Sequence, residues 1–233
     1  MKKILPLIYL PIVMGCQQGI SVQEVLDKHR AAIGDTESLS NLYTLSACEG
    51  PEGAYTTETH SSLGDDYLLF KQDYTYKDNP FYAAIYTKSK GQGLDTLLQP
   101  RGALSEVVIA ILKAHEFHEL MLQVGDRYFE MDLAGDTVFF DTKCWQIQAV
   151  DHLSYPVKLF FNKRTGLMEG FSHVNAFNKN EVIQVHFEDW ETVKDLNLFK
   201  KVMIKQGDLK KYYFDFQNIE WNSDRFKKLE IPS

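Results

Sequence analysis

The sequence predicts a mainly β protein of the α+β type, in which an antiparallel sheet of about eleven strands curls into a barrel or a partial barrel. Most segments between 42 and 221 alternate apolar and polar residues, the pattern of strands with one buried face. These segments are short, and glycine, proline, asparagine or aspartate separates them. Only 21–34 and 103–122 show a helical period, and no linker or repeat divides 21–233. We therefore expect one domain there.

The N-terminus has the form of an export signal. Lys2 and Lys3 make a basic head, and the apolar run that follows is too short to span a bilayer as a helix. The run ends in Val13-Met14-Gly15-Cys16, which resembles a bacterial lipobox. This resemblance implies a signal peptide over 1–15 and acylation of Cys16 after cleavage. The alternative is an ordinary signal peptide that happens to contain a cysteine.

An acylated Cys16 would hold the protein at a membrane. Residues 16–20 form a tether that reaches about 15 Å, so the folded body would lie close to the lipid. Gln17, in place of an aspartate, resembles the sorting signal of enterobacterial outer-membrane lipoproteins, and no acidic run for surface export follows it. We therefore expect an outer-membrane lipoprotein that faces the periplasm.

The first folded element is a helix over 21–34. Ser21 and Glu24 form a capping box, and Gly34 ends the helix. Strands are predicted over 42–49, 54–63, 66–74 and 81–88, with a short additional one over 91–99. After residue 122 they are predicted over 126–133, 137–150, 157–162, 167–175, 181–190, 199–205 and 209–221. A turn at Ala134-Gly135-Asp136 is expected to join the first two of this second group.

The second helix is predicted over 103–122, and it is apolar on most of its circumference. One stripe consists of Leu104, Val107, Val108, Ile111 and Leu112. Ile109 and Ala110 make the opposite side apolar as well. Such a helix must be covered on most sides. We therefore expect it either deep in the core or across an apolar surface as a lid, with the stripe lining the concave side of the sheet.

Composition excludes some partners. The formal net charge of −7 argues against nucleic-acid binding, which requires a basic face. Apolar residues make up 44% of the chain, enough for a real core. Cys48 and Cys144 are left after Cys16 is used for lipid, either as one disulfide or as two buried thiols, of which we favour the thiols. We expect a monomer.

The candidate catalytic patterns are incomplete. In His115-Glu116-Phe117-His118-Glu119 the histidines are three residues apart, not four as in a zinc-binding helix, so we interpret the segment as a polar helix end. Asp151, His152 and Ser154 lack the strand–turn–helix context of a nucleophile. Gly91-x-Gly93 lacks the third glycine of a dinucleotide loop. We therefore predict a protein that is not an enzyme and that has no metal or cofactor.

Several stretches, in this order, resemble the lipoprotein-carrier-like proteins of the LolA/LolB superfamily. They are the helix end Ala31-Ala32-Ile33-Gly34 with Leu42-Tyr43-Thr44-Leu45, the hairpin 162–167, the strand pair 187–190 and 198–201, and the closing segment 219–222 with Phe226. The resemblance implies a half-open antiparallel barrel whose mouth is plugged by helices and whose apolar cavity holds acyl chains. Cys16 makes the chain more similar to the anchored receptor type than to a soluble carrier.

This resemblance leads to a functional hypothesis. We expect a membrane-anchored lipoprotein that binds or transfers a hydrophobic ligand, either a lipid or the acyl chains of an acylated protein. Leu104, Val107, Val108, Ile111 and Leu112 are the expected cavity or lid residues. The alternative is a non-catalytic interaction or scaffold lipoprotein with a filled barrel. The two differ in whether the interior holds an apolar void of roughly 300–1,000 Å³.

Overall fold

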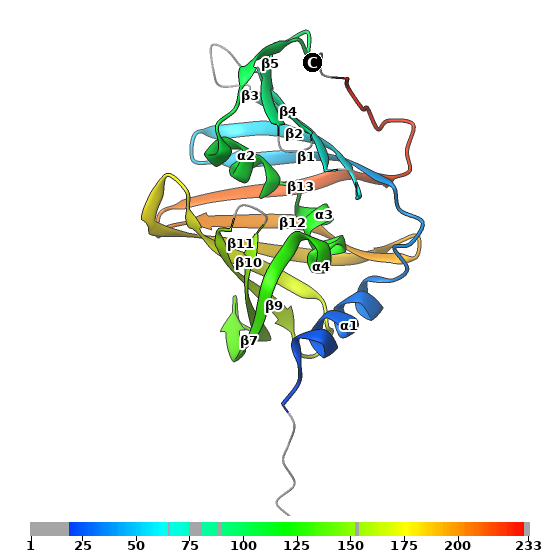
Figure 1. Ribbon diagram of the computed structural model, residues 1–233, viewed down its shortest axis with the longest axis vertical. Helices are drawn as coiled ribbons and strands as arrows, with labels where there is room; N and C mark the ends of the chain where they lie inside the picture. Colours follow the sequence, from blue (N-terminus) through cyan, green and yellow to red (C-terminus); the bar gives the residue numbers. More distant parts are fainter. Residues whose placement is uncertain (1–18, 65, 75–80, 88–89, 152–153, 231–233) are drawn as a thin grey trace, which may run out of the picture.

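The computed structural model describes residues 19–64, 66–74, 81–87, 90–151 and 154–230. The predicted signal peptide and the predicted lipidation of Cys16 fall outside these residues. Within them, thirteen strands form one antiparallel sheet, and four helices accompany it (Figure 1). The sheet curls without closing, which confirms the mainly β, half-open barrel. None of the described helices is long and apolar enough to cross a membrane.

The strands follow one another in a long meander. The first six are β1 (Asn41–Gly50), β2 (Gly53–Ser62), β3 (Tyr67–Tyr74), β4 (Phe81–Thr87), β5 (Lys90–Leu94) and β6 (Pro100–Ala103). The other seven are β7 (Tyr128–Phe139), β8 (Thr142–Asp151), β9 (Pro156–Asn162), β10 (Met168–Asn175), β11 (Asn178–Val193), β12 (Leu196–Gln206) and β13 (Lys210–Trp221). Every pairing joins neighbours along the chain except that of β1 with β13, which unites the two halves.

The sheet order places β6 at one edge and β7 at the other, although the two strands are close in the sequence. The chain between them must therefore cross the open side of the curled sheet. It does so in three short helices, α2 (Glu106–Lys113), α3 (Phe117–Leu122) and α4 (Val124–Arg127). Figure 1 shows these helices in front of the sheet, between its upper and lower parts. Topology thus places them over the concave face.

The N-terminal helix α1 (Val22–Ile33) has the predicted capping box. The amide of Glu24 donates to Ser21 Oγ over 3.2 Å, and the Ser21 amide donates to Glu24 Oε2 over 2.7 Å. Its buried side chains are Val25, Leu26, His29 and Ile33. Gly166, in the β9–β10 turn, has φ +80°, and a Cβ there would lie 2.9 Å from the Lys28 carbonyl oxygen. Glycine therefore lets this turn approach the helix closely.

One strand is missing from the prediction, and one predicted turn is wrong. The four-residue edge strand β6 was not predicted, because Pro100 to Ala103 are all exposed and have no apolar alternation. The β7–β8 turn lies at Phe140 and Asp141, both with positive φ, and not at Ala134-Gly135-Asp136. Gly135 instead occupies an irregularity inside β7, where the register shifts against β8. A glycine can mark either a turn or a bulge, and here it marks a bulge.

The single helix predicted over 103–122 is also wrong. Ala103 ends β6, and the helical stretch stops at Ala114 before it restarts at Phe117. The break follows from the polar residues in this stretch. A continuous apolar helix could be buried only if it carried few ionisable side chains. Lys113, Glu116 and Glu119 are all buried here, and each of them needs a polar partner. The interrupted path lets both carboxylates meet Arg127.

Candidate functional site

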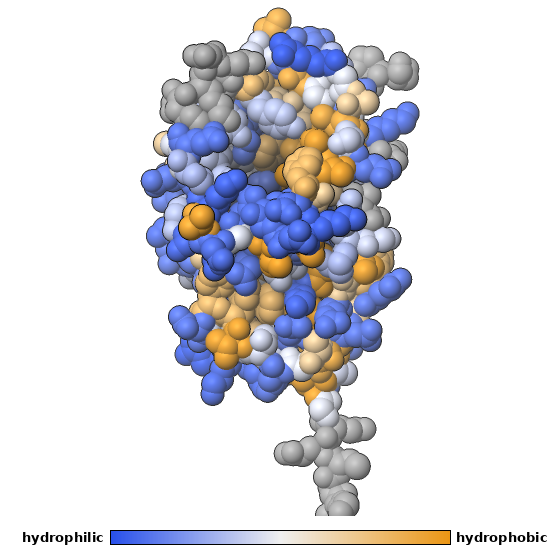
Figure 2. Space-filling model, turned by 90° about the vertical axis from the view of Figure 1, so that its left-hand side faces the viewer, coloured by the Kyte–Doolittle hydropathy of each residue, from blue (hydrophilic) through white to orange (hydrophobic). Residues whose placement is uncertain are grey.

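A cavity of about 470 Å³ lies on the concave side, between α2 and the sheet. Its walls come from α2, from the strands β2 to β4 and from the strands β10 to β13. The space-filling view shows this side of the molecule hollowed in its upper half, with apolar residues gathered around the hollow and a hydrophilic band below it (Figure 2). The cavity has the size of typical small-ligand sites.

The lining is mostly aromatic and aliphatic. Its apolar and aromatic members are Tyr55, Phe70, Tyr74, Tyr82, Val108, Ile111, Leu112, Ala114, Ala176, Phe177, Ile183, Val185, Ile204, Tyr212 and Phe214. The polar members are Gln72, His115, His173, Asn175 and Gln206. Burial lowers the pKa of His115 and of His173, so both are neutral at pH 7. The lining residues described are therefore uncharged, and the buried part of a ligand must be uncharged too.

Polar groups of the lining gather near the β10–β11 and β12–β13 turns. Asn175 Nδ2 donates to Glu181 Oε2 over 2.5 Å, and Gln206 Nε2 donates to the same oxygen over 2.8 Å. These bonds lower the pKa of Glu181, so its carboxylate is ionised at neutral pH. Val108, Ile111 and Leu112 add apolar side chains to the same lining. The cavity thus has an amphipathic interior.

The structure brings three of the five predicted site residues into this cavity. Val108, Ile111 and Leu112 line it. Leu104 instead packs beside Gly91 and Gly93 of β5, and Val107 is half-buried outside the lining. The helical period grouped Val108, Ile111 and Leu112 on the face of α2 that lines the cavity. Leu104 lies outside the helix, because α2 begins two residues later, at Glu106.

Sequence reasoning missed the contribution of the sheet. Tyr212 and Phe214 alternate along β13, and Phe70, Gln72 and Tyr74 alternate along β3, all toward the cavity. The period of two was visible in the sequence. It separates the two faces of a strand, but it does not tell which face is concave.

Packing holds α2 in place over the cavity. Ser105 Oγ accepts a bond from the Val108 amide at the N-terminus. Ile109 and Leu112 join a buried cluster with Leu68, Phe70, Ala84 and Tyr86. The fit against β5 is close, because a Cβ on Gly91 would lie 2.7 Å from Ile109 Cγ1. Ile109, which faces away from the predicted stripe, thus anchors α2 to the sheet together with Leu112.

A buried ionic cluster fixes the C-terminal end of α2. Lys113 Nζ lies 2.9 Å from Asp66 Oδ1 and 3.0 Å from Glu116 Oε2. The Arg127 guanidinium lies 3.0 Å from Glu116 Oε2 and 3.0 Å from Glu119 Oε2. The cluster therefore joins α2, α3 and α4 to one another and to the turn before β3.

The pKa values in this cluster follow from burial and from its charges. Burial raises the pKa of Glu119 to about 8, with the nearby charge of Glu116 adding to the effect. Burial is the largest single effect and lowers the pKa of Lys113, but Glu116, Glu119 and the hydrogen bond to Asp66 together outweigh it, so the pKa is raised. The hydrogen bond and charge of Lys113 in turn lower the pKa of Asp66, against the effect of burial. Lys113 and Asp66 are thus ionised at neutral pH.

The interpretation of His115–Glu119 as a polar helix end is wrong in one respect, because the segment lies inside the protein. Glu116, His118 and Glu119 are all buried. His118 Nε2 lies 2.9 Å from the Phe199 carbonyl oxygen, and its ring stacks on that of Phe199 at 4.0 Å. Among the residues described, no group of three or more His, Cys, Asp or Glu side chains could hold a metal ion.

The two remaining cysteines are free. Cys48 and Cys144 are both buried and are not bonded to each other, as the favoured alternative predicted. Burial raises the pKa of the Cys48 thiol to about 11 and that of Cys144 to about 12. Both are therefore protonated and chemically inert at neutral pH.

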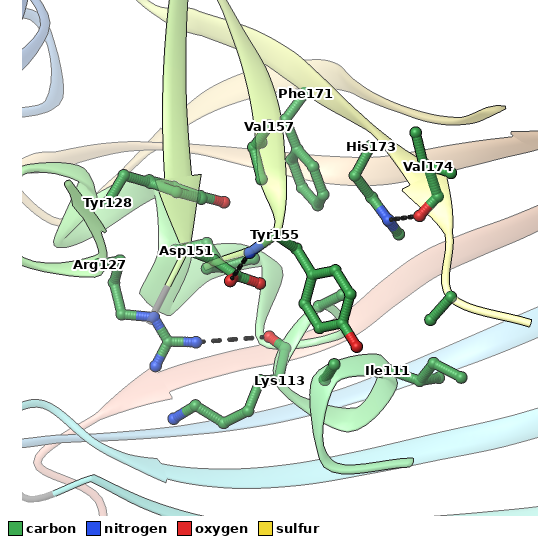
Figure 3. A pocket seen from close by; sticks show the side chains of 14 residues that line it. Ile111, Lys113, Arg127, Tyr128, Asp151, Tyr155, Val157, Phe171, His173 and Val174 are labelled. Atoms are coloured by element: carbon green, nitrogen blue, oxygen red, sulfur yellow. Dashed lines mark hydrogen bonds between the residues drawn. The ribbon is translucent and has the colours of Figure 1, made fainter. Parts of the chain in front are cut away.

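A second, smaller opening of about 50 Å³ lies beside the first, and the two share Ile111, Ala114, His173 and Ala176. Figure 3 shows its polar side, where an Arg127 N–H donates to the Lys113 carbonyl oxygen and the Tyr155 amide donates to Asp151. This volume is enough for one or two water molecules but not for a lipid. The larger cavity is therefore the candidate ligand site.

Comparison with known proteins identifies the fold. No family model and no curated protein sequence matches the chain. Among solved structures, a LolA superfamily protein from Nitrosomonas europaea has a TM-score of 0.60 at 10% identity, covering 90% of this chain and 99% of that one. A DUF1329 family protein from Desulfovibrio piger has a TM-score of 0.60 at 12% identity, covering 86% of this chain and 92% of that one.

A third structure agrees with these two. An outer-membrane lipoprotein-sorting protein domain from Vibrio parahaemolyticus has a TM-score of 0.57 at 8% identity, covering 86% of this chain and 92% of that one. Identities this low establish the fold and not the activity. The half-open barrel with its crossing helices is therefore the fold that this chain shares with LolA superfamily and lipoprotein-sorting structures.

Proposed function

We propose that this protein is a membrane-anchored, non-enzymatic lipoprotein whose body, residues 21–233, binds or transfers a hydrophobic ligand. The ligand is a lipid or the acyl chains of an acylated protein. The observation that carries the proposal is the cavity of about 470 Å³ beneath α2, whose lining residues are uncharged. A scaffold with a filled barrel would not need such a void. The fold shared with LolA superfamily structures supports the same function.

The interior also suggests how the ligand lies. Its acyl part would contact the apolar lining, which includes Val108, Ile111 and Leu112. A polar group with hydrogen-bonding capacity would lie near Asn175 and Gln206. This orientation keeps apolar groups on apolar walls and leaves polar groups satisfied.

Mass analysis of co-purified lipid tests the proposal. The chain beginning at Gln17 lacks the signal and the anchor but keeps every described element, the first of which starts at Val22. We expect lipid extraction of this purified protein to yield an amphiphile with an acyl chain. Ile111→Asp, which places a charge in the cavity lining, should remove the lipid while the protein stays folded. Recovery of the same lipid from Ile111→Asp would contradict the proposed site.

A matched variant separates a ligand contact from a core contact. Ile109 is buried with 6% exposure, whereas Ile111 is only half-buried. Ile109→Asp should therefore destabilise the whole domain, by about 3–5 kcal/mol, because it buries an unpaired charge. Equal destabilisation by both changes would assign Ile111 to the core.

The location is the second part of the proposal. We propose that Cys16 carries the acyl anchor and that the protein is a monomer in the outer membrane facing the periplasm. Labelled palmitate supplied to expressing bacteria should be incorporated into the parent chain and not into Cys16→Ser, which should no longer be anchored. Equal labelling of both chains would contradict the anchor site.

A further inference from the structure

Two histidines of the cavity lining have their tautomers fixed by backbone carbonyl groups. His115 follows α2, and its Nδ1 lies 2.7 Å from the Ile111 carbonyl oxygen. His173 belongs to β10, and its Nδ1 lies 3.0 Å from the Val174 carbonyl oxygen (Figure 3). A carbonyl oxygen only accepts hydrogen bonds, so Nδ1 carries the proton in both rings. Since burial keeps both rings neutral at pH 7, Nε2 is left without a proton.

Nε2 is therefore a hydrogen-bond acceptor in both histidines. Neither Nε2 atom is hydrogen-bonded to another residue within the part of the chain that the structure describes. The two rings also lie close enough for the charge of a protonated His173 to lower the pKa of His115. A single headgroup with several polar atoms can therefore meet both acceptors.

The amide side chains of the lining add a third acceptor. Asn175 Oδ1 accepts from a backbone amide over 2.9 Å, and Gln72 Oε1 accepts from a tyrosine hydroxyl. The oxygens of these two amides are thus engaged within the protein. Gln206 differs, because its nitrogen donates to Glu181 while its Oε1 bonds to none of the described residues. The two histidine nitrogens and this oxygen are left for a ligand.

These acceptors select the headgroup of the ligand. A buried acceptor that meets no donor weakens binding, so a matching ligand brings O–H or N–H groups. The carboxylate of a fatty acid has only acceptor oxygens, and the ionised Glu181 beside Gln206 repels it. An ammonium group donates, but its charge would be buried among uncharged lining residues. Uncharged hydroxyl groups meet both conditions.

We infer that the cavity selects an uncharged lipid with free hydroxyl groups, of the monoacylglycerol class, through His115 Nε2, His173 Nε2 and Gln206 Oε1. This inference rests on the proposed function, which gives the cavity a hydrophobic ligand. The hydroxyl groups donate to the three acceptors while the acyl chain contacts the apolar lining. An ionised fatty acid binds through its chain alone, with its carboxylate kept at the opening toward solvent.

Displacement of a fluorescent fatty acid by amphiphiles with matched chains tests the inference. The protein is the chain beginning at Gln17, and the competitors are monodecanoylglycerol, methyl decanoate, decanoate and decylamine. We expect monodecanoylglycerol to bind about tenfold more tightly than methyl decanoate, which has the same acyl chain but no donor. Decanoate and decylamine should also bind more weakly than monodecanoylglycerol, because both are charged.

Two histidine variants assign the preference to named atoms. His115→Phe and His173→Phe keep an aromatic ring and lose the acceptor. Each should reduce the preference for monodecanoylglycerol over methyl decanoate, and the double variant should bring it to about twofold or less. The affinity for methyl decanoate should stay that of the parent. The ratio of the two affinities is the readout, because general damage to the cavity would weaken both ligands alike.

A matched control and the melting temperature keep this test specific. His186 is a half-buried histidine whose ring stacks on Phe140, away from the residues that line the cavity. His186→Phe should therefore keep the full preference for monodecanoylglycerol. A melting temperature close to that of the parent shows that a variant is folded. If one of the two lining variants unfolds, the other still measures the loss of an acceptor.

Three results would overturn the inference. The first is equal affinity of the parent protein for monodecanoylglycerol and methyl decanoate. The second is tighter binding of decanoate or decylamine than of monodecanoylglycerol. The third is an undiminished preference in the folded double histidine variant. Each of these leaves the proposed function standing, because the chains still bind. A parent protein that binds neither the fluorescent probe nor any competitor would overturn the proposed function and this inference with it.

Discussion

Lys113, at the end of α2, and Asp66, in the turn before β3, form an ion pair of 2.9 Å that joins the crossing helices to the upper part of the sheet. Lys113 is buried with 3% exposure, whereas the Asp66 side chain is 47% exposed. The same ammonium group pairs with the buried Glu116. Lys113 is therefore the residue through which the ionic cluster holds α2 against the sheet.

This pairing makes Lys113→Met a strongly destabilising change. It removes a buried cation and leaves Glu116 with Arg127 as its only partner in the cluster. Breaking a buried pair from one side costs about 3–5 kcal/mol, and urea unfolding should show a loss of that order. Asp66→Asn removes the half-exposed partner and should cost about 1 kcal/mol or less. Equal losses for both variants would show that the cluster does not depend on Lys113.

The contact between Gly91 and Ile109 predicts a second asymmetry. Gly91→Ala places a Cβ at 2.7 Å from Ile109 Cγ1, and α2 must shift to accept it. Such overpacking costs about 1–3 kcal/mol. Gly93→Ala is the matched control in the same strand, because its nearest neighbour atom would lie at 3.8 Å, an ordinary contact. Thermal melting should separate the two variants, and identical melting temperatures would contradict the close fit of α2.

Buried histidine gives the fold a pH dependence. Burial lowers the pKa of His118 to about 3, whereas in the unfolded chain it is near 6.5. Above pH 6.5 the residue is mostly neutral in both states, and the folded protein keeps its full stability. As pH falls from 6.5 toward 3, the unfolded chain binds a proton on this histidine that the folded protein does not, so the free energy of unfolding decreases. For His118 the loss between pH 7 and pH 5 is about 2 kcal/mol. The raised pKa of Glu119 acts in the opposite direction over this range.

A comparison with His118→Gln isolates this contribution, because Glu119 is present in both proteins. The variant should be less stable than the parent at pH 7, since it loses the stacking on Phe199. By pH 5 the difference should be smaller by about 2 kcal/mol, because glutamine does not titrate. Urea unfolding at the two pH values measures it. A difference that stays constant would show that His118 titrates normally in the folded protein.

The strand-rich part of the fold could be predicted because alternation is a local signal. The capping box at Ser21 and Glu24 and most strands of the meander appear in the sequence as period-two or capping patterns. The Gly135 bulge could not be separated from a turn, since both need a glycine and only pairing with β8 distinguishes them. The predicted position of the β7–β8 turn is therefore wrong, whereas the predicted meander of antiparallel strands is confirmed.

The candidate site was predictable only in part. The apolar stripe identified Val108, Ile111 and Leu112, but the break at Ala114 depends on the pairing of Glu116 and Glu119 with Arg127. That pairing joins residues of different helices, so it produces no periodic pattern in the sequence. The tyrosines of the lining were equally hidden, because the curl of the sheet decides which of its faces encloses a cavity.

The central claim is that the cavity beneath α2 holds the hydrophobic ligand, and titration with a fluorescent fatty acid tests it most directly. Val108 lines the cavity and its neighbour Val107 does not, so Val108→Trp and Val107→Trp are matched variants on one helix. Both should stay folded by thermal melting. We predict that the parent and Val107→Trp bind the probe with similar affinity and that Val108→Trp, which fills the cavity, binds at least tenfold more weakly. Equal binding by all three proteins would contradict the claim.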